Sequence, residues 1–298
     1  MKTSLAILLV SLIALRMPAA DATAPQPALD SFARTASFFA KFGTNKVHYA
    51  TLGNGSNTVV FIHGWAGSIH PWRFQVPALA SKAGLILIDL PGHGKSDKPK
   101  TAYTMDFFAR AVDAVLQDAK VDKAVLVGFS MGTPVACRFY RQFPAKVQAL
   151  VAVDGSLRGF DATDQQKERF IAPYRGADYQ EAARKFIGAM FPNPGTEAVR
   201  DGMLEDVVKT PQHVMVSAFE GMFDKTSWEL KKIDVPLLVV NAKSPFWTED
   251  YEAHVRTLQP KAEYHVIEGP GHFLMLEKPA EFNAMLVEFL QKNGLIEK

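Results

Sequence analysis

The chain has 298 residues, of which 48% are hydrophobic and 21% are charged, so it has enough apolar material for one large core and is not expected to be disordered. Its formal net charge of +2 leaves no excess of basic residues to neutralise phosphates, which excludes nucleic acid as an expected partner. The single cysteine, Cys137, cannot form an intramolecular disulfide, and we expect it to be a small buried hydrophobe.

The first residues are typical of a secretory signal peptide. The apolar run from Leu5 to Leu15 is followed by small residues that suit cleavage near Ala20 or Ala22. This run is shorter than the about 20 residues of a membrane span, and no later stretch is long and apolar enough for one. We therefore expect residues 1–22 to be a cleaved signal and the mature protein to be secreted or periplasmic. Arg16, directly after the run, leaves an uncleaved anchor as the alternative.

Short strands come first in the mature chain. Alternating residues predict an antiparallel hairpin formed by residues 36–42 and 46–52. Thr58 to Ile62 is apolar on both faces, as a buried parallel strand requires, and it runs directly into His63-Gly64-Trp65. We expect His63 to stabilise this loop rather than to act as a base, because another histidine is better placed for that role.

Helices and strands then alternate along the chain. The pattern predicts a helix over residues 71–82, a strand over 84–90, a helix over 105–119 and a strand over 123–127. This order predicts an α/β fold with a mostly parallel, doubly wound sheet. In such sheets ligands bind at the carboxyl ends of the strands.

The stretch Gly128-Phe129-Ser130-Met131-Gly132 joins the last of these strands to a predicted helix that begins at Thr133. A serine held in a strained conformation at the tip of so tight a turn needs neighbours without side chains, which explains both glycines. The serine oxygen is then exposed beside unpaired backbone N–H groups at the positive end of a helix. Ser130 is therefore a candidate nucleophile for attack on a carbonyl carbon.

Four motifs in order resemble the α/β-hydrolase fold family over roughly residues 35–295. The resemblance implies Ser130 as the nucleophile and His272 as the general base, with the backbone N–H groups of Trp65 and Met131 as the oxyanion hole. The chemistry of both side chains suits these roles, since a serine needs a base within hydrogen-bond reach and a histidine titrates near neutral pH. The four motifs are His63-Gly64-Trp65-Ala66-Gly67, the stretch 89–99, Gly128 to Gly132, and Gly269-Pro270-Gly271-His272-Phe273.

The acid of the expected Ser-His-acid triad departs from the resemblance. In most relatives an aspartate follows the strand that here reads Val235 to Val240, but this chain has no carboxylate at that place. The candidates are Asp154, at the end of the predicted strand 149–153, and Glu249 or Asp250, a few residues beyond the usual place. We favour Asp154, because Glu249 and Asp250 suit the acidic first turn of a helix.

The strand pattern stops between residues 155 and 233, where four helical stretches are predicted: residues 163–174, 179–191, 196–209 and 211–223. We expect residues 155–233 to be a helical lid inserted between two parts of the α/β-hydrolase core, residues 23–154 and 234–298. The Phe and Met residues of this segment, together with Trp65 and Trp247, predict an apolar substrate pocket.

These features favour a serine hydrolase that cleaves carboxylic esters, lactones included, of small to medium apolar substrates through an acyl-enzyme. An aspartate at the position of Ser130 would instead be typical of haloalkane dehalogenases and epoxide hydrolases with this fold. The alternatives are a cofactor-free haloperoxidase or perhydrolase, a carbon–carbon bond hydrolase with the same triad, and a non-catalytic ligand-binding protein. No metal-ligand spacing is found, and we expect neither a metal nor a cofactor. The sequence does not indicate the oligomeric state.

Overall fold

The computed structural model describes residues 35–229 and 232–297. The predicted signal peptide, residues 1–22, and both cleavage sites lie outside these residues. Among the described helices, none has the length and apolar character that crossing a membrane requires.

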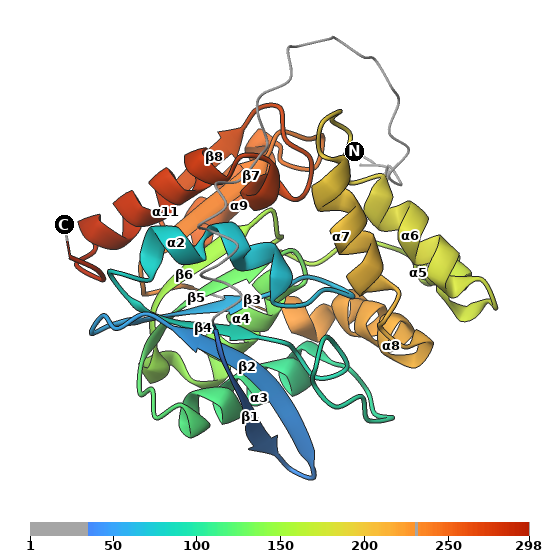
Figure 1. Ribbon diagram of the computed structural model, residues 1–298. Coiled ribbons are helices and arrows are strands. Elements are labelled where there is room, and N and C mark those ends of the chain that lie inside the picture. The colour runs from blue at the N-terminus through green and yellow to red at the C-terminus, as the bar shows by residue number, and fades with distance from the viewer. Residues whose placement is uncertain (1–34, 230–231, 298) are drawn as a thin grey trace.

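An eight-stranded sheet in the order β1-β2-β4-β3-β5-β6-β7-β8 runs through the middle of the molecule (Figure 1). β1 pairs with β2 and β2 with β4 in antiparallel fashion, and the other neighbouring strands are parallel. The predicted α/β fold with a mostly parallel sheet and an N-terminal hairpin is thus confirmed. The strands are β1 Ala36–Phe42, β2 Asn45–Leu52, β3 Thr58–Ile62, β4 Gly84–Ile88, β5 Ala124–Phe129, β6 Val147–Val153, β7 Leu237–Ala242 and β8 Glu263–Ile267.

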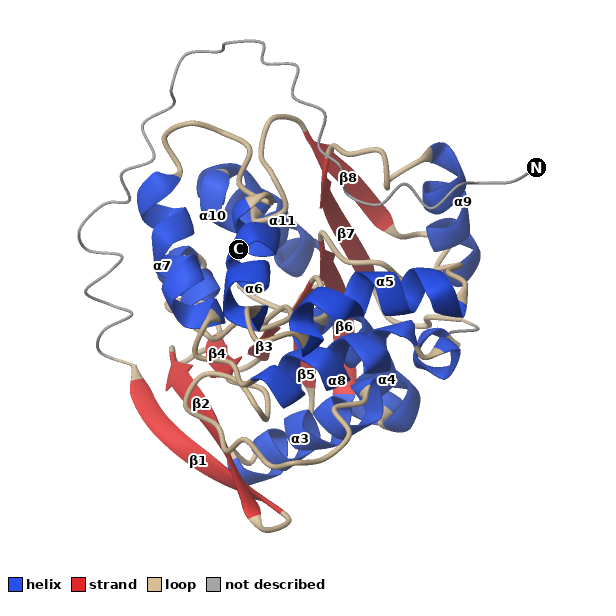
Figure 2. Ribbon diagram, turned by 90° about the vertical axis from the view of Figure 1, so that its right-hand side faces the viewer, coloured by secondary structure: helices blue, strands red, loops and turns tan. Residues whose placement is uncertain are grey.

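Helices lie on both faces of this sheet (Figures 1 and 2). On one face α3 and α4 pack against each other and against the strands, and on the other face α2, α10 and α11 pack together. The helices are η1 His70–Phe74, α2 Val76–Leu79, α3 Met105–Asp118, α4 Gly132–Gln142, η2 Pro144–Lys146, α5 Asp164–Arg175, α6 Tyr179–Gly188, α7 Glu197–Val207, α8 Gln212–Phe223, η3 Lys225–Trp228, α9 Glu249–Leu258, α10 Leu274–Glu277 and α11 Pro279–Lys292.

The single helix predicted over residues 71–82 is wrong. The chain forms two short segments there, the 3-10 helix η1 and the four-residue α2. Pro71 and Pro77 each lie in the first turn of one segment. Proline has no N–H to donate inside a helix, so Pro77 begins a new segment instead of continuing the first one.

The core contains the central strands and the helices beside them. Every residue of β5 is buried, which agrees with a parallel strand covered on both faces. Cys137 lies on α4 in this core, and burial raises the pKa of its thiol to about 12. The expectation that Cys137 is a buried hydrophobe rather than a reactive thiol is confirmed.

Four helices, α5 to α8, occupy the chain between β6 and β7 and are called the inserted helices from here on. α5 packs against α6 and α8, and α6 packs against α7. In Figure 1 they form a group beside the sheet rather than a layer over either of its faces. Their starts agree with the sequence prediction to within a residue.

Two glycines allow α4 to start directly against the sheet. A Cβ atom on Gly132 would lie 2.2 Å from the carbonyl oxygen of Ile62 at the end of β3. A Cβ atom on Gly128 would lie 2.4 Å from the carbonyl oxygen of Gly132. Both contacts are with backbone atoms, which cannot rotate away as a side chain can. The turn around Ser130 therefore requires glycine on both sides.

We predict that Gly132→Ala destabilises the protein by about 1–3 kcal/mol, because the added methyl group forces α4 away from β3. Gly202→Ala is the matched control. Gly202 lies exposed on α7, and a Cβ atom there would meet nothing within 4 Å. This change should stabilise the protein by up to about 1 kcal/mol through helix propensity. Urea unfolding of both variants measures the difference, and an equal effect of the two would contradict the packing argument.

Candidate active site

Ser130 lies at the tip of the turn between β5 and α4. Its φ of +52° is in the left-handed region, which costs free energy for any residue except glycine. Hydrogen bonds hold this conformation: the Ser130 N–H donates to the Val153 carbonyl at 3.0 Å, and the Ser130 carbonyl accepts from the Thr133 N–H at 3.0 Å. The Ser130 hydroxyl makes no hydrogen bond to any described residue. Its oxygen is therefore available to a substrate.

His272 follows β8 and lies beside the end of β6. Its Nδ1 is 2.5 Å from Oδ2 of Asp154. Since an ionised carboxylate only accepts, Nδ1 carries the proton and Nε2 is left with a lone pair. The His272 ring also packs against Phe129, with ring centroids 4.8 Å apart. Phe129 immediately precedes Ser130, so the structure brings the imidazole and the serine to the same edge of the sheet.

Asp154 is the first residue after β6 and is 7% exposed. Its N–H donates to the carbonyl of Val240 at 2.8 Å, which ties it to β7. Its Oδ1 accepts two hydrogen bonds, from the Ala242 N–H at 2.8 Å and from Nε1 of Trp247 at 2.9 Å. Trp247 was expected to line the pocket, but its polar atom points at the carboxylate instead. Three donors thus hold Asp154, including His272 on Oδ2.

The other two candidate acids lie elsewhere. Asp250 is in the first turn of α9, and its Oδ2 is 2.7 Å from Nη1 of Arg158. Its side chain is 81% exposed. Glu249 is also exposed and begins the same helix, which is the acidic first turn predicted for this segment. Among the described residues, Asp154 is the one carboxylate that hydrogen-bonds to His272.

Met131 follows Ser130 in the chain, and Trp65 follows Gly64, whose loop lies against Ser130. Neither backbone N–H donates to a described residue, and that of Met131 lies at the start of α4, where the helix dipole is positive. The two loops are in contact: a Cβ atom on Gly64 would lie 3.1 Å from the Cβ of Ser130. Backbone N–H groups without partners near a candidate nucleophile are the kind of donor that stabilises a developing oxyanion.

Residues 57–201 match the sequence model of a family described as the alpha/beta hydrolase fold. The chain has the α/β-hydrolase fold. One relative of this hydrolase is the dihydrolipoyllysine-residue acetyltransferase component of the acetoin cleaving system of Cupriavidus necator. It is 26% identical over 287 residues, which cover 91% of this chain and 74% of the relative.

Two further proteins are similar to this hydrolase. A 2-hydroxy-6-oxononadienedioate/2-hydroxy-6-oxononatrienedioate hydrolase of Paraburkholderia phymatum is 29% identical over 262 residues, covering 82% of this chain and 91% of the relative. A solved structure of Est816, described as an N-acyl homoserine lactone degrading enzyme, is 28% identical and has a TM-score of 0.70, covering 85% of this chain and 100% of that chain. The reactions in these names differ, so the family match identifies a hydrolase without fixing the bond that it cleaves.

In this hydrolase the connection between α6 and α7 contacts the loop that carries His272, which is called the histidine loop from here on. The His272 N–H donates to the carbonyl of Met190, between α6 and α7, at 3.2 Å. Nδ2 of Asn193 donates to the Gly269 carbonyl at 2.6 Å and to Oε2 of Glu277 at 2.8 Å. The other oxygen of Glu277 accepts from the Gly271 N–H at 3.0 Å. Burial raises the pKa of Glu277. Neither Asn193 nor Glu277 has a local sequence signal, because their contacts join segments far apart in the chain.

The inserted helices also contact the loop that carries Trp65. The Trp65 ring stacks on Phe219 of α8 with centroids 4.2 Å apart, and its Nε1 donates to the Met215 carbonyl at 2.9 Å. Tyr174 of α5 and Phe186 of α6 pack edge-on against the same ring. The Trp65 backbone is thus fixed by an aromatic cluster drawn from three inserted helices, and the surroundings of the site are apolar.

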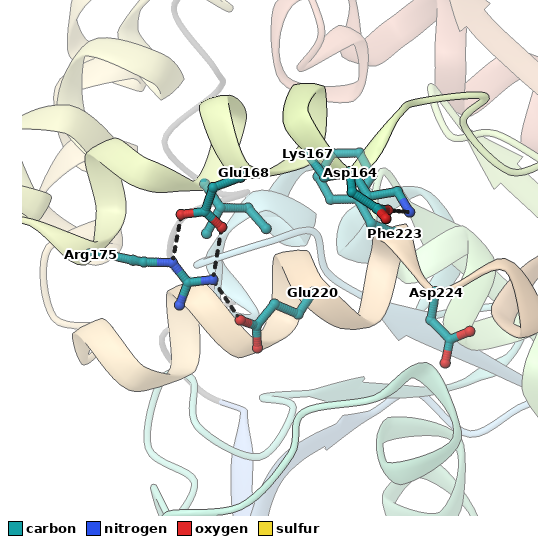
Figure 3. A pocket seen from close by; sticks show the side chains of 8 residues that line it. Asp164, Lys167, Glu168, Arg175, Glu220, Phe223 and Asp224 are labelled. Atoms are coloured by element: carbon teal, nitrogen blue, oxygen red, sulfur yellow. Dashed lines mark hydrogen bonds and ion pairs between the residues drawn. The ribbon is translucent and has the colours of Figure 1, made fainter.

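A hollow of this hydrolase lies between α5 and α8, away from the candidate catalytic residues (Figure 3). Arg175 bridges two carboxylates there, with Nη2 at 2.8 Å from Oε1 of Glu220 and Nε at 3.4 Å from Oε1 of Glu168. None of its lining residues is a candidate catalytic residue. This hollow is a surface ion-pair network and not the reaction site. Within the described ranges no group of three His, Cys, Asp or Glu residues is placed to hold a metal ion.

Two buried histidines support the Trp65 loop. Nδ1 of His63 donates to the Gly64 carbonyl at 2.7 Å, and its Nε2 accepts from the Leu90 N–H at 3.0 Å. This geometry confirms His63 as a loop-stabilising residue. The ring of His93 packs 5.0 Å from that of His63. Burial lowers the pKa of His63 and lowers that of His93 to about 3, so both are neutral in the folded protein.

We predict that acid destabilises the protein through these two histidines. The pKa of His93 is about 3 when folded and 6.5 when unfolded, so the unfolded chain binds more protons between these pH values. The free energy of unfolding should therefore fall as the pH drops below 6.5, by up to about 1.4 kcal/mol per pH unit for each such histidine. Urea unfolding at pH 7.5, 6 and 5 measures this slope. His93→Gln should make it shallower, and parallel curves for variant and wild type would contradict the assignment.

Proposed function

We propose that this protein is a serine hydrolase that cleaves carboxylic esters, lactones included, through an acyl-enzyme on Ser130. The observation that carries the proposal is the hydrogen bond of 2.5 Å between Nδ1 of His272 and Oδ2 of Asp154, at the sheet edge where Ser130 lies. An imidazole held in this way presents Nε2 as a general base. A serine with a base of this kind is the arrangement used for acyl transfer.

In the first half of the reaction, Nε2 of His272 takes the proton from the Ser130 hydroxyl while Oγ attacks the ester carbonyl carbon. The carbonyl oxygen becomes an oxyanion and accepts hydrogen bonds from the N–H groups of Trp65 and Met131. Asp154 stabilises the imidazolium that forms, without taking its proton. When the tetrahedral intermediate collapses, the bond to the alkoxy group breaks and Nε2 returns the proton to the leaving alcohol.

In the second half, water replaces the alcohol. Nε2 of His272 takes a proton from the water as its oxygen attacks the acyl carbon, and the same N–H groups hold the second oxyanion. Collapse then breaks the bond to Ser130 Oγ, which regains the proton from Nε2. The acid product leaves and the site returns to its starting state.

The side chains around the site support an apolar acyl or alcohol group. Phe129 and Phe273 pack against His272, and Phe191 of the inserted segment stacks on Phe273 with centroids 4.5 Å apart. We propose that the inserted helices act as the lid of this site, because they contact both the Trp65 loop and the histidine loop. A substrate that enters from their side must part these contacts.

Carbon–carbon bond hydrolysis is the second candidate, since the relative from Paraburkholderia phymatum is named for a dienedioate substrate. A dioate carries two carboxylates, and a matching site would present basic side chains. Among the described residues, no Lys or Arg side chain hydrogen-bonds or pairs with Ser130, Asp154 or His272.

Hydrolysis of p-nitrophenyl acetate and butyrate tests the proposal. We predict that Ser130→Ala lowers kcat/KM by about 10⁶-fold, since it removes the nucleophile, and that Asp154→Asn lowers it by about 10⁴-fold, since it removes the charged acid. Asp250→Asn is the matched control, because Asp250 pairs with Arg158 on the surface, and its kcat/KM should stay within about twofold of wild type. Equal rates for Ser130→Ala and wild type would favour a ligand-binding protein, and a large loss in Asp250→Asn alone would overturn the choice of acid.

A further inference from the structure

The loop between β7 and α9 lies where most α/β-hydrolases carry their acid, and in this chain it carries Trp247. The indole N–H of Trp247 donates to Oδ1 of Asp154 at 2.9 Å. The Ala242 N–H donates to the same oxygen at 2.8 Å. One carboxylate oxygen thus receives two donors, one from the last residue of β7 and one from this loop, while the other oxygen faces His272.

This division matters because a carboxylate rotates easily about its last torsion, which is broad and has no sharp energy wells. Two donors on Oδ1 fix that rotation and leave the lone pairs of Oδ2 directed at Nδ1 of His272. Hydrogen bonds to an ionised group are also about twice as strong as those between neutral groups. The indole N–H is therefore placed to fix the rotation of the Asp154 carboxylate relative to the His272 imidazole.

The indole is itself held in place. Its ring packs against Tyr251 of α9, with centroids 4.8 Å apart, and Tyr251 is 1% exposed. The Tyr251 hydroxyl accepts from the Leu157 N–H at 3.0 Å and donates to the Gly155 carbonyl at 3.3 Å. Gly155 and Leu157 lie one and three residues after Asp154 in the chain. Trp247 and Tyr251 together therefore bracket the turn that carries the carboxylate.

The turn needs such support. Asp154 has a φ of +40°, in the left-handed region that a residue with a side chain adopts only when its surroundings enforce it. Its N–H and both carboxylate oxygens are all engaged, by Val240, Ala242, Trp247 and His272. The end of β7 and the loop after it each supply one donor to a carboxylate that directly follows the neighbouring strand, β6.

We propose that Trp247 is a positioning residue of the catalytic triad: its indole N–H orients Asp154, and through Asp154 it sets the orientation of His272. The loop that carries the acid in most α/β-hydrolases here carries a donor to an acid that directly follows β6. This inference rests on the proposed function, which assigns Asp154 as the triad acid and His272 as the general base. The hydrogen bonds that carry it are independent of the substrate.

Trp247→Phe removes the N–H and keeps an aromatic ring against Tyr251. Trp228→Phe is the matched control. Nε1 of Trp228 also donates a partly buried hydrogen bond, to the Met222 carbonyl at 2.7 Å, and makes none to the candidate catalytic residues. With p-nitrophenyl butyrate, Trp247→Phe should lower kcat by about 10- to 100-fold, as expected for a lost hydrogen bond to a charged group, and leave KM within about twofold. Trp228→Phe should leave both constants within about twofold.

A second readout needs no turnover. The proton between His272 and Asp154 should give a far-downfield resonance in the proton NMR spectrum of the free protein, assigned by its loss in His272→Gln. Trp247→Phe should shift or broaden this resonance, and Trp228→Phe should leave it in place. If Trp247→Phe does not fold, benzothienylalanine at position 247 keeps the shape of the indole and replaces only the N–H with sulfur.

An unmoved resonance together with an unchanged kcat in Trp247→Phe would overturn the inference. Failure of the proposed function looks different. Ser130→Ala would then match wild type in the ester assay, while the NMR comparison would still report whether the indole orients the Asp154–His272 pair. A loss of kcat with an equal loss in Trp228→Phe would show a general effect of removing a tryptophan and would also count against the positioning role.

Discussion

The carboxylate of Asp154 is the point at which three parts of the sheet edge meet. It leaves β6, its N–H and Oδ1 are bound by β7 and the loop after it, and its Oδ2 binds the histidine that follows β8. Such a carboxylate cannot be buried without partners, because an unpaired charge in the interior is costly. The four hydrogen bonds therefore stabilise the fold at the same place where they prepare the imidazole. The stability of the sheet edge and the orientation of His272 thus both depend on the Asp154 carboxylate.

The nucleophile depends on a different constraint, the close approach of α4 to the sheet. Gly128 and Gly132 permit that approach, and the resulting turn places Ser130 in a left-handed conformation with its hydroxyl free. The inserted helices then link the two halves of the site. The Met190 carbonyl accepts from the histidine loop and the Met215 carbonyl accepts from Trp65. A movement of these helices would therefore displace both loops that carry site residues.

Features with a local signal could be predicted from the sequence. The buried strands, the hairpin and the turn around Ser130 follow from hydrophobic pattern and glycine placement, and Asp154 follows from its place at a strand end. The break between η1 and α2 also has a local signal, Pro77, although the alternating pattern of the chain predicts one helix over residues 71–82. The hydrogen bond from Trp247 to Asp154 spans 93 positions and that from Asn193 to Glu277 spans 84, and neither leaves a pattern in the sequence. Trp247 was therefore assigned by its apolar ring, whereas the fold uses its N–H.

In the proposed reaction, Ser130 is activated by the His272 imidazole, whose Nδ1 is hydrogen-bonded to Asp154. The most direct measurement is labelling with a fluorophosphonate, whose phosphorus is attacked by an activated serine with loss of fluoride, followed by peptide mass spectrometry. We expect a single adduct on Ser130 and strongly slowed labelling when His272 is replaced by glutamine. An adduct on another residue, or labelling of Ser130 at the same rate without the imidazole, would contradict this activation of Ser130.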